Sequence, residues 1–144
     1  MKLLLDTAFI LPSLGIDAGE EVLKGLKKLA DIKADVYCSR FSILEALWVA
    51  ARLSKSANID QESFRSGLRS ILESRRYMKV EEDSEIFIEA LKLYTLGHKD
   101  MMDNILYASS ASLNLQLLTL DKELKEFIRN NRLNDTLVFP NQIP

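Results

Sequence analysis

The chain has 144 residues and a formal net charge of −2, and 47% of its residues are hydrophobic while 28% are charged. This size suits one domain with a single core, residues 1–144, and the near-neutral balance excludes a protein that holds nucleic acid by overall positive charge. The single cysteine, Cys38, excludes an intramolecular disulfide framework and is typical of a reducing compartment, so we expect a cytoplasmic protein. Asp6 interrupts the first apolar run too early for a signal peptide, and no stretch reaches the roughly 20 apolar residues of a membrane span.

The first half of the chain is predicted to alternate strands with helices. Lys2 to Leu5 is a short continuous apolar run, as in a strand buried on both faces of a parallel sheet. Three helices with apolar residues at helical spacing follow, and Asp17, Ser42 and Asp60 are the residues expected to cap them. The predicted elements are a strand at 2–5, a helix at 18–30, a strand at 34–38, helices at 43–53 and 61–75, and a strand at 77–80.

The second half continues the alternation. Ser84 is expected to cap a helix that ends at Gly97, and Asp100 to cap a helix that begins at Met101 and stops near Asn114. The predicted elements are helices at 85–96 and 101–113, a strand at 116–120, a helix at 122–130 after Asp121, and a strand at 136–139. The whole pattern predicts an α/β fold: a three-layer α/β/α sandwich around a mostly parallel sheet of four to five strands.

Five acidic residues, Asp100 among them, are predicted to meet at one edge of this sheet. Asp6 follows the first strand, and Asp121 follows the strand at 116–120. Glu45 and Asp103 lie near the amino ends of helices that begin at the same edge. Right-handed crossovers place the carboxyl ends of parallel strands together, so topology alone brings these acids into one pocket. Carboxylates on buried faces are costly unless something pairs with them, which is a first indication of a bound metal ion.

Three nearby residues have a structural explanation beside the functional one. Glu45 stands three residues after Ser42, the spacing of a capping box, so it can serve the helix start, the pocket, or both. Asp100 is expected to be an N-cap and is a doubtful addition to the acidic site. His98, the single histidine, follows Gly97 in a predicted loop and is expected to be an ordinary surface residue.

The order of these acids resembles the PIN-domain nuclease family, and most closely its VapC-type toxin ribonucleases. Asp6 in LLLDTAFIL resembles the first motif of the family, Glu45 in SILEAL the second, and Asp103 in DNILYASSA the third. Thr119 and Asp121, in TLD, resemble the closing T-x-D signature. The match runs from Lys2 to Phe139, with one departure: the residues after Asp103 are Asn-Ile-Leu-Tyr, where the family more often has small alanines.

The donor types predict a hard cation. Carboxylates without a histidine or cysteine cluster suit Mg²⁺ or Mn²⁺ better than zinc. We expect Asp6 and Asp103 to be the principal ligands, with Glu45 and Asp121 completing the pocket or supporting a second ion. Thr119 would orient Asp121 or a bound water. The resulting hypothesis is metal-dependent hydrolysis of a phosphodiester, and the resemblance implies RNA as the substrate and a 5′-phosphate product.

A basic strip is a second candidate feature. Between Arg52 and Lys79 there are seven basic and three acidic residues, a local balance of +4 in a chain of net charge −2. Arg69 and Arg76 within this strip, and Arg40 just before the helix of Glu45, can track a phosphate backbone toward the acids. The alternative is a solvated helix face with no role in binding.

The resemblance to VapC-type toxins also implies protein partners. A toxin of this kind is covered by an antitoxin and usually forms a homodimer, and the apolar faces at 43–53 and 64–72 could extend into a partner groove. A stand-alone PIN-like RNA-processing nuclease, or a catalytically weak module that binds RNA or protein, is the alternative. A receiver domain and a D-x-D phosphatase are disfavoured because Asp6 has no acidic neighbour and position 8 is alanine, and a P-loop and a G-x-G-x-x-G turn are absent.

Overall fold

A five-stranded parallel sheet of strand order β3-β2-β1-β4-β5 forms the centre of the computed structural model, which describes residues 1–56 and 59–144. All four neighbouring pairs of strands run parallel. The strands are β1 (Lys2–Leu5), β2 (Asp35–Cys38), β3 (Met78–Lys79), β4 (Gln116–Leu118) and β5 (Leu137–Val138). The predicted fold class is therefore confirmed, and over the described residues the sheet is wholly parallel.

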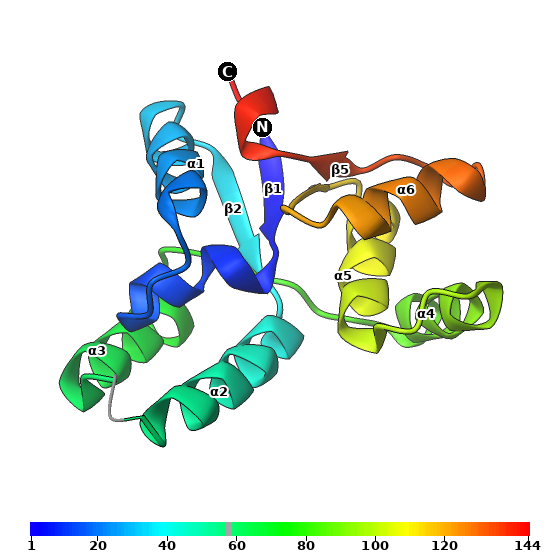
Figure 1. Ribbon diagram of the computed structural model, residues 1–144. Coiled ribbons are helices and arrows are strands. Elements are labelled where there is room, and N and C mark those ends of the chain that lie inside the picture. The colour runs from blue at the N-terminus through cyan, green and yellow to red at the C-terminus, as the bar shows by residue number, and fades with distance from the viewer. Residues whose placement is uncertain (57–58) are drawn as a thin grey trace.

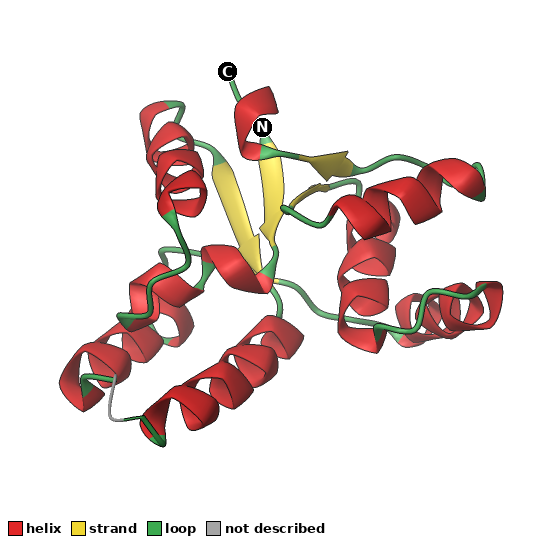
Figure 2. Ribbon diagram, viewed as in Figure 1, coloured by secondary structure: helices red, strands yellow, loops and turns green. Residues whose placement is uncertain are grey.

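Six helices cover the two faces of the sheet (Figures 1 and 2). They are α1 (Glu20–Asp31), α2 (Arg40–Ser54), α3 (Gln61–Leu72), α4 (Ser84–Leu96), α5 (Met101–Ser112) and α6 (Lys122–Asn130). Leu3 and Leu5 of β1 pack into one buried cluster with residues of α1, α2 and α3, whereas Leu4 packs into another with residues of α4, α5 and α6. Because successive residues of a strand point to opposite faces, β1 contributes side chains to the buried clusters on both faces of the sheet.

The direction of chain winding reverses beside β1. The chain passes from β1 to β2 and β3 on one side, then returns to place β4 and β5 on the other. In parallel α/β sheets such a switch point leaves a crevice at the carboxyl ends of the two strands involved. Here Asp6 follows β1 and its backbone N–H donates to Leu118 O at the end of β4, at 3.0 Å. The segment that carries Asp6 therefore lies at the base of this crevice.

The helix starts confirm some predicted caps and correct others. Asp60, Asp100 and Asp121 are the N-caps of α3, α5 and α6, as expected. The predictions for the other three helices were wrong by one to three residues, because the caps are Gly19, Ser39 and Asp83 in place of Asp17, Ser42 and Ser84. Local side-chain hydrogen bonds account for two of the cases: the Asp17 carboxylate accepts the N–H of Gly19 in the turn before α1, and the Asp83 carboxylate accepts the N–H of Ile86.

The predicted element ends were too long at four places. α3 stops at Leu72 rather than residue 75, and β3, β4 and β5 are shorter than the apolar runs that predicted them. A strand is limited by the length of the partner with which it pairs, so β3 extends only over the two residues opposite Tyr37 and Cys38. Three short 3-10 helices, at Thr7–Phe9, Leu11–Leu14 and Pro140–Gln142, were not predicted.

Helix α2 is less buried than its composition predicted. The expectation was a helix packed nearly all round, yet the fully buried residues along it are Ser42 and Ala46. Leu44, Leu47 and Trp48 remain 39%, 42% and 52% exposed. One face packs on the core and the other leaves apolar side chains in solvent, which is unusual enough to indicate a contact surface. In the ranges that the structure describes, no helix combines the length and apolarity needed to cross a lipid bilayer.

Candidate active site

Asp6 and Thr119 form the centre of the candidate site. Asp6 caps the short helix after β1, and its Oδ1 accepts the N–H of Thr7 at 2.7 Å. Its Oδ2 accepts the hydroxyl proton of buried Thr119 at 2.6 Å. Thr119 Oγ1 in turn accepts the N–H of Asp121 at 3.0 Å. One hydroxyl therefore links the acid after β1 to the acid that begins α6, and holds both at the switch point.

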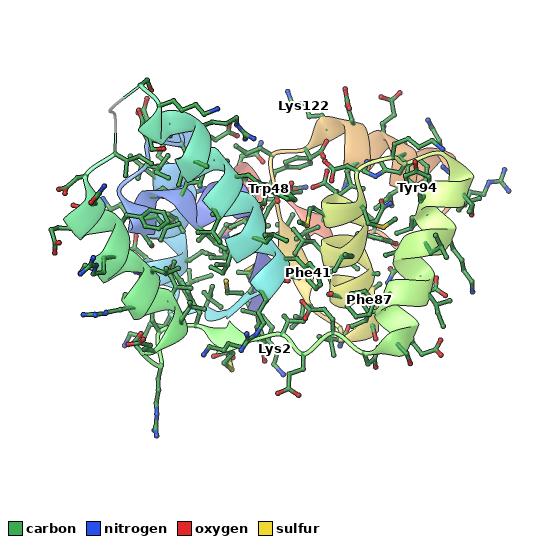
Figure 3. The ribbon with its side chains drawn as sticks, turned by 90° about the horizontal axis from the view of Figure 1, so that it is seen from below. Lys2, Phe41, Trp48, Phe87, Tyr94 and Lys122 are labelled. Atoms are coloured by element: carbon green, nitrogen blue, oxygen red, sulfur yellow. The ribbon has the colours of Figure 1, made fainter. Side chains whose placement is uncertain are left out.

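Asp103 and Asp121 approach the same point from the two helices on the other face of the sheet. Asp103 lies in the first turn of α5, where its N–H donates to the carboxylate of Asp100 at 3.1 Å. Asp121 caps α6 and accepts the N–H of Leu124 at 3.0 Å. Asp100 thus has the capping role expected of it. Figure 3, a view onto the carboxyl edge of the sheet, shows α2 on one side and α5 and α6 on the other.

The electrostatics show that the acids are close together. Burial raises the pKa of Asp6 to about 6, against the hydrogen bonds from Thr119 and Thr7 that lower it, and the charges of Glu45 and Asp121 raise it further. Burial also raises the pKa of Asp103 to about 9, with additional repulsion from Asp6, Asp100 and Asp121. Like charges in a poorly solvated pocket disfavour ionisation, so the site holds more carboxylates than it can ionise by itself. The roles of Asp6, Glu45, Asp103 and Asp121 as metal ligands stay a prediction.

Glu45 does not stand at the start of its helix. Because Ser39 caps α2, Glu45 is the sixth helical residue and stands in the second turn. A capping box requires the acid at the third helical residue, so that explanation of Glu45 was wrong. Ser39 Oγ accepts the N–H of Phe41 at 3.1 Å and donates to Glu82 at 2.6 Å, which fixes the start of α2 through a contact distant in sequence. The half-buried Glu45 carboxylate remains without a structural explanation other than the pocket.

Two buried hydroxyls adjoin the acids along the chain. Thr7 Oγ1 follows Asp6, and Ser42 Oγ precedes Glu45 by three residues on the same side of α2. Within the described residues neither atom has a hydrogen-bond partner. A buried hydroxyl without a partner costs on the order of 1–3 kcal/mol, so both are available to a water molecule or a ligand.

The family model of the PIN domain matches residues 3–130, a range that includes Asp6, Glu45, Asp103, Thr119 and Asp121. The chain belongs to the PIN domain family. The resemblance inferred from the acidic motifs is thereby confirmed. None of the curated proteins matches this PIN domain in sequence.

Solved structures of similar fold include the following three, one of which is described as a toxin–antitoxin complex. A toxin–antitoxin complex from Klebsiella pneumoniae is 16% identical with a TM-score of 0.61, and the alignment covers 96% of this chain and 97% of that one. VapBC2 from Rickettsia felis, bound to a DNA fragment from its promoter, is 17% identical with a TM-score of 0.62 and the same coverage. FitAcB from Neisseria gonorrhoeae is 18% identical with a TM-score of 0.57, again covering 96% and 97%. At these identities the likeness establishes the fold of this PIN domain.

His98 is the site residue that sequence reasoning missed. A ring nitrogen of His98 and carboxylate oxygens of Asp103 and Asp121 all lie within 4.8 Å of one another. His98 therefore lies beside two of the acids, and its role there stays a prediction. The position of His98 in the sequence could have indicated this place. The loop between Gly97 and Asp100 leads to the start of α5 at the pocket, so the side chains of this loop lie near the acids.

The basic residues proposed for substrate binding lie toward α3 and β3. Arg40 lines a small cavity together with Leu72 and Lys79, and Arg76 lies over the ring of Tyr77 at 4.8 Å. Arg69 is exposed on α3. In the part of the chain that the structure describes, no hydrogen bond or ion pair connects Arg40, Arg69 or Arg76 to the acids. A role for Arg40, Arg69 and Arg76 in binding RNA stays a prediction.

Proposed function

We propose that this PIN domain is a metal-dependent endoribonuclease that hydrolyses RNA phosphodiester bonds in the cytoplasm. The observation that supports the proposal is the grouping of Asp6, Glu45, Asp103 and Asp121 at the switch point of the sheet, where burial, with added repulsion from neighbouring acids, raises the pKa of Asp103 to about 9. A pocket of this kind is unfavourable for a metal-free protein and favourable for one that binds a cation, because the cation removes the repulsion.

The donor set fits Mg²⁺ or Mn²⁺. Asp6 and Asp103 would be the principal ligands, with Glu45 and Asp121 completing the site directly, through water, or by supporting a second ion. These four carboxylates supply hard oxygen atoms, and the raised pKa values of Asp6 and Asp103 mark an excess of negative charge. When bound, the ion would supply a water of lowered pKa and stabilise the charge that develops on the phosphodiester.

The chain's own residues would prepare the site before substrate arrives. The hydroxyl of Thr119 holds one oxygen of Asp6 and the N–H of Thr7 holds the other, so the Asp6 carboxylate has a fixed orientation. Rigid positioning of this kind lowers the reorganisation needed during reaction. Phe41, Glu45 and Trp48 follow at helical spacing on one side of α2, and half-exposed Trp48 offers a surface on which an unpaired base can stack beside the acids (Figure 3).

The test compares wild type with Asp6→Asn and Asp103→Asn on single-stranded RNA, in Mg²⁺, in Mn²⁺ and in EDTA. We expect cleavage by wild type with either metal, a 5′-phosphate on the product, and loss of at least about a hundredfold in either variant. Asp31→Asn, an exposed acid at the end of α1, is the matched control and should cleave as wild type does. Equal cleavage by all four proteins would identify a contaminant and refute the proposal.

We also propose that the domain is the toxin of a toxin–antitoxin pair. The supporting observation is an apolar groove of about 460 Å³ between α2 and α3, lined by residues that include Leu47, Ala50, Phe64 and Leu68. The groove continues onto the exposed apolar side chains of α2, and an amphipathic helix of an antitoxin would bury both. The structures of similar fold include such complexes, which is consistent with this partner.

Induction in a bacterial host tests the toxin proposal. Wild type should arrest growth, Asp103→Asn should not, and co-expression of the protein encoded beside this gene should restore growth to wild type. Leu47→Asp should remain toxic and resist that rescue, because Leu47 is 42% exposed and lines the groove. Growth unaffected by the active nuclease would favour a stand-alone RNA-processing enzyme.

The homodimer expected from the family likeness has a candidate surface on α4. Phe87, Ile88 and Leu91 are 42%, 45% and 57% exposed, so this helix presents apolar side chains that a second copy could cover. Light scattering after size exclusion should give twice the monomer mass of 16.4 kDa for wild type, and the monomer mass for Leu91→Asp. A monomeric wild type at micromolar concentration would refute the dimer.

A further inference from the structure

His98 occupies a place from which it can bind the same ion as two of the acids. It lies in the turn between α4 and α5, whereas Asp103 belongs to α5 and Asp121 caps α6. The ring nitrogen and the two carboxylate oxygens lie within 4.8 Å of one another. Ligand atoms on one divalent ion stand about 2.0–2.3 Å from it, so atoms on opposite sides of the ion are about 4.0–4.6 Å apart. The limit of 4.8 Å for this cluster exceeds that span by a few tenths of an ångström, a distance that small side-chain rotations can close.

Among the described residues, the side-chain hydrogen bond of His98 uses Nδ1, and none uses Nε2. His98 Nδ1 lies 2.7 Å from Asn104 Oδ1, and Asn104 Nδ2 donates to the backbone oxygen of His98 at 2.8 Å. The amide nitrogen of Asn104 is thereby committed to a carbonyl, so its oxygen must face the ring and accept from it. Nδ1 therefore carries the proton in the neutral ring, and the lone pair is on Nε2.

The ring is also held in a fixed orientation. Asn104 is fully buried in α5, and the His98 ring packs against Phe127 of α6 with 5.1 Å between ring centroids. The backbone N–H of His98 donates to Leu93 O at 3.1 Å, which anchors the turn to α4. A histidine that donates Nδ1–H to a buried amide oxygen while its ring is packed has the second contact that orients a metal-binding imidazole. A merely solvated surface histidine needs none of these contacts.

We propose that Nε2 of His98 is a nitrogen ligand of the divalent ion held by Asp103 and Asp121, and that it gives the site a preference for Mn²⁺ over Mg²⁺. The inference rests on the proposed metal-dependent function and adds a ligand that the acidic motifs do not contain. Mg²⁺ takes oxygen ligands almost exclusively, whereas imidazole binds transition-metal ions well. Replacing one carboxylate by imidazole also reduces the negative charge around the ion.

Electron paramagnetic resonance of the Mn²⁺-loaded protein tests the ligand directly, without RNA. Wild type should show the ¹⁴N modulation of a coordinated imidazole, and His98→Phe, which retains a ring to pack on Phe127, should lack it. Calorimetric titration with each ion should give wild type a ratio of Mn²⁺ to Mg²⁺ affinity on the order of tenfold higher than that of His98→Phe. His98→Gln, which keeps a polar side chain, should behave as His98→Phe does in the resonance experiment.

The outcomes separate this inference from the proposed function. Stoichiometric Mn²⁺ binding by wild type without ¹⁴N modulation would overturn the inference even if RNA is cleaved. An unchanged affinity ratio in His98→Phe would also overturn it. A ¹⁴N signal that disappears in both variants would support the inference even if no RNA is cleaved, in which case the proposed activity alone would fail.

Discussion

Asp103→Asn is expected to stabilise the metal-free protein at pH 8, although it removes a proposed ligand. The folded-state pKa of Asp103 is about 9, against 3.8 for the ordinary group. The folded protein therefore binds more protons than the unfolded chain between pH 4 and pH 9, and its stability falls as the pH rises through that window. Asparagine resembles the protonated acid because its side-chain amide can also donate a hydrogen bond to Asp121. Unlike the acid, asparagine does not ionise, so this destabilisation is absent from the variant.

The size of this effect follows from the pKa values. One pKa unit corresponds to about 1.4 kcal/mol, so the rise of the Asp6 pKa from 3.8 to about 6 alone costs about 3 kcal/mol at neutral pH. The shift of Asp103 is larger, but its carboxyl is partly exposed and hydrogen-bonded to Asp121, so we discount its contribution to about 2–4 kcal/mol. The net stabilisation should raise Tm by about 6 °C or more.

Urea unfolding in EDTA at pH 8 and at pH 4 measures the effect, with the fluorescence of Trp48, the single tryptophan, as the signal. The variant should be more stable than wild type at pH 8 and nearly equal to it at pH 4. Mg²⁺ at one hundred times Kd should remove most of the difference at pH 8, because wild type gains about 2.7 kcal/mol there. Asp31→Asn should match wild type throughout. A variant no more stable than wild type at pH 8 in EDTA would refute the view that burial and repulsion of the Asp103 carboxylate destabilise the metal-free protein.

Three further predictions concern single residues around the site and the fold. Thr119→Val removes a hydrogen bond that lowers the pKa of Asp6, so this pKa should rise. The acidic limb of the pH–rate profile of RNA cleavage should then move to higher pH. A profile that does not move would contradict the proposed role of the hydroxyl. Asp100→Ala removes an N-cap and should cost about 1 kcal/mol in urea unfolding while cleavage changes less than about threefold, and a loss of cleavage comparable to that of Asp6→Asn would instead make Asp100 a ligand. Gly67→Ala would place a methyl group 1.8 Å from the carbonyl oxygen of Ser13, so thermal unfolding should show a loss of about 3 kcal/mol or more; an unchanged Tm would mean that α3 can move away from that chain at no cost.

The acidic site was predictable because its parts depend on local patterns and one topological rule. Apolar runs mark the strands, and a parallel sheet brings the residues after β1 and β4 to one edge whatever the details of packing. Asp6 and Thr119 are far apart in the chain and are joined by a hydrogen bond for this reason. The caps Asp60, Asp100 and Asp121 were predictable too, since each hydrogen-bonds to an amide within three residues.

The start of α2 was not predictable in the same way. Ser39 and Ser42 are both good caps by residue type, and the choice between them depends on Glu82, which accepts the Ser39 hydroxyl from another segment. That choice decides whether Glu45 stands at the helix start or in the pocket. The exposure of Trp48 and its neighbours was also misjudged, because composition reports how apolar a helix is and not how many of its faces other elements cover.

The sequence by itself determined the α/β class, the order of the elements, and the four acids that meet at the carboxyl edge, since periodicity, helix caps and strand ends are properties of short segments. Only the tertiary structure decided that Glu45 has no part in capping, that His98 faces Asp103 and Asp121, and that a groove opens between α2 and α3. These features depend on contacts between residues distant in the chain, and on which surfaces remain uncovered after the core has formed. Such contacts are selected by the packing of the whole domain, so no local pattern encodes them.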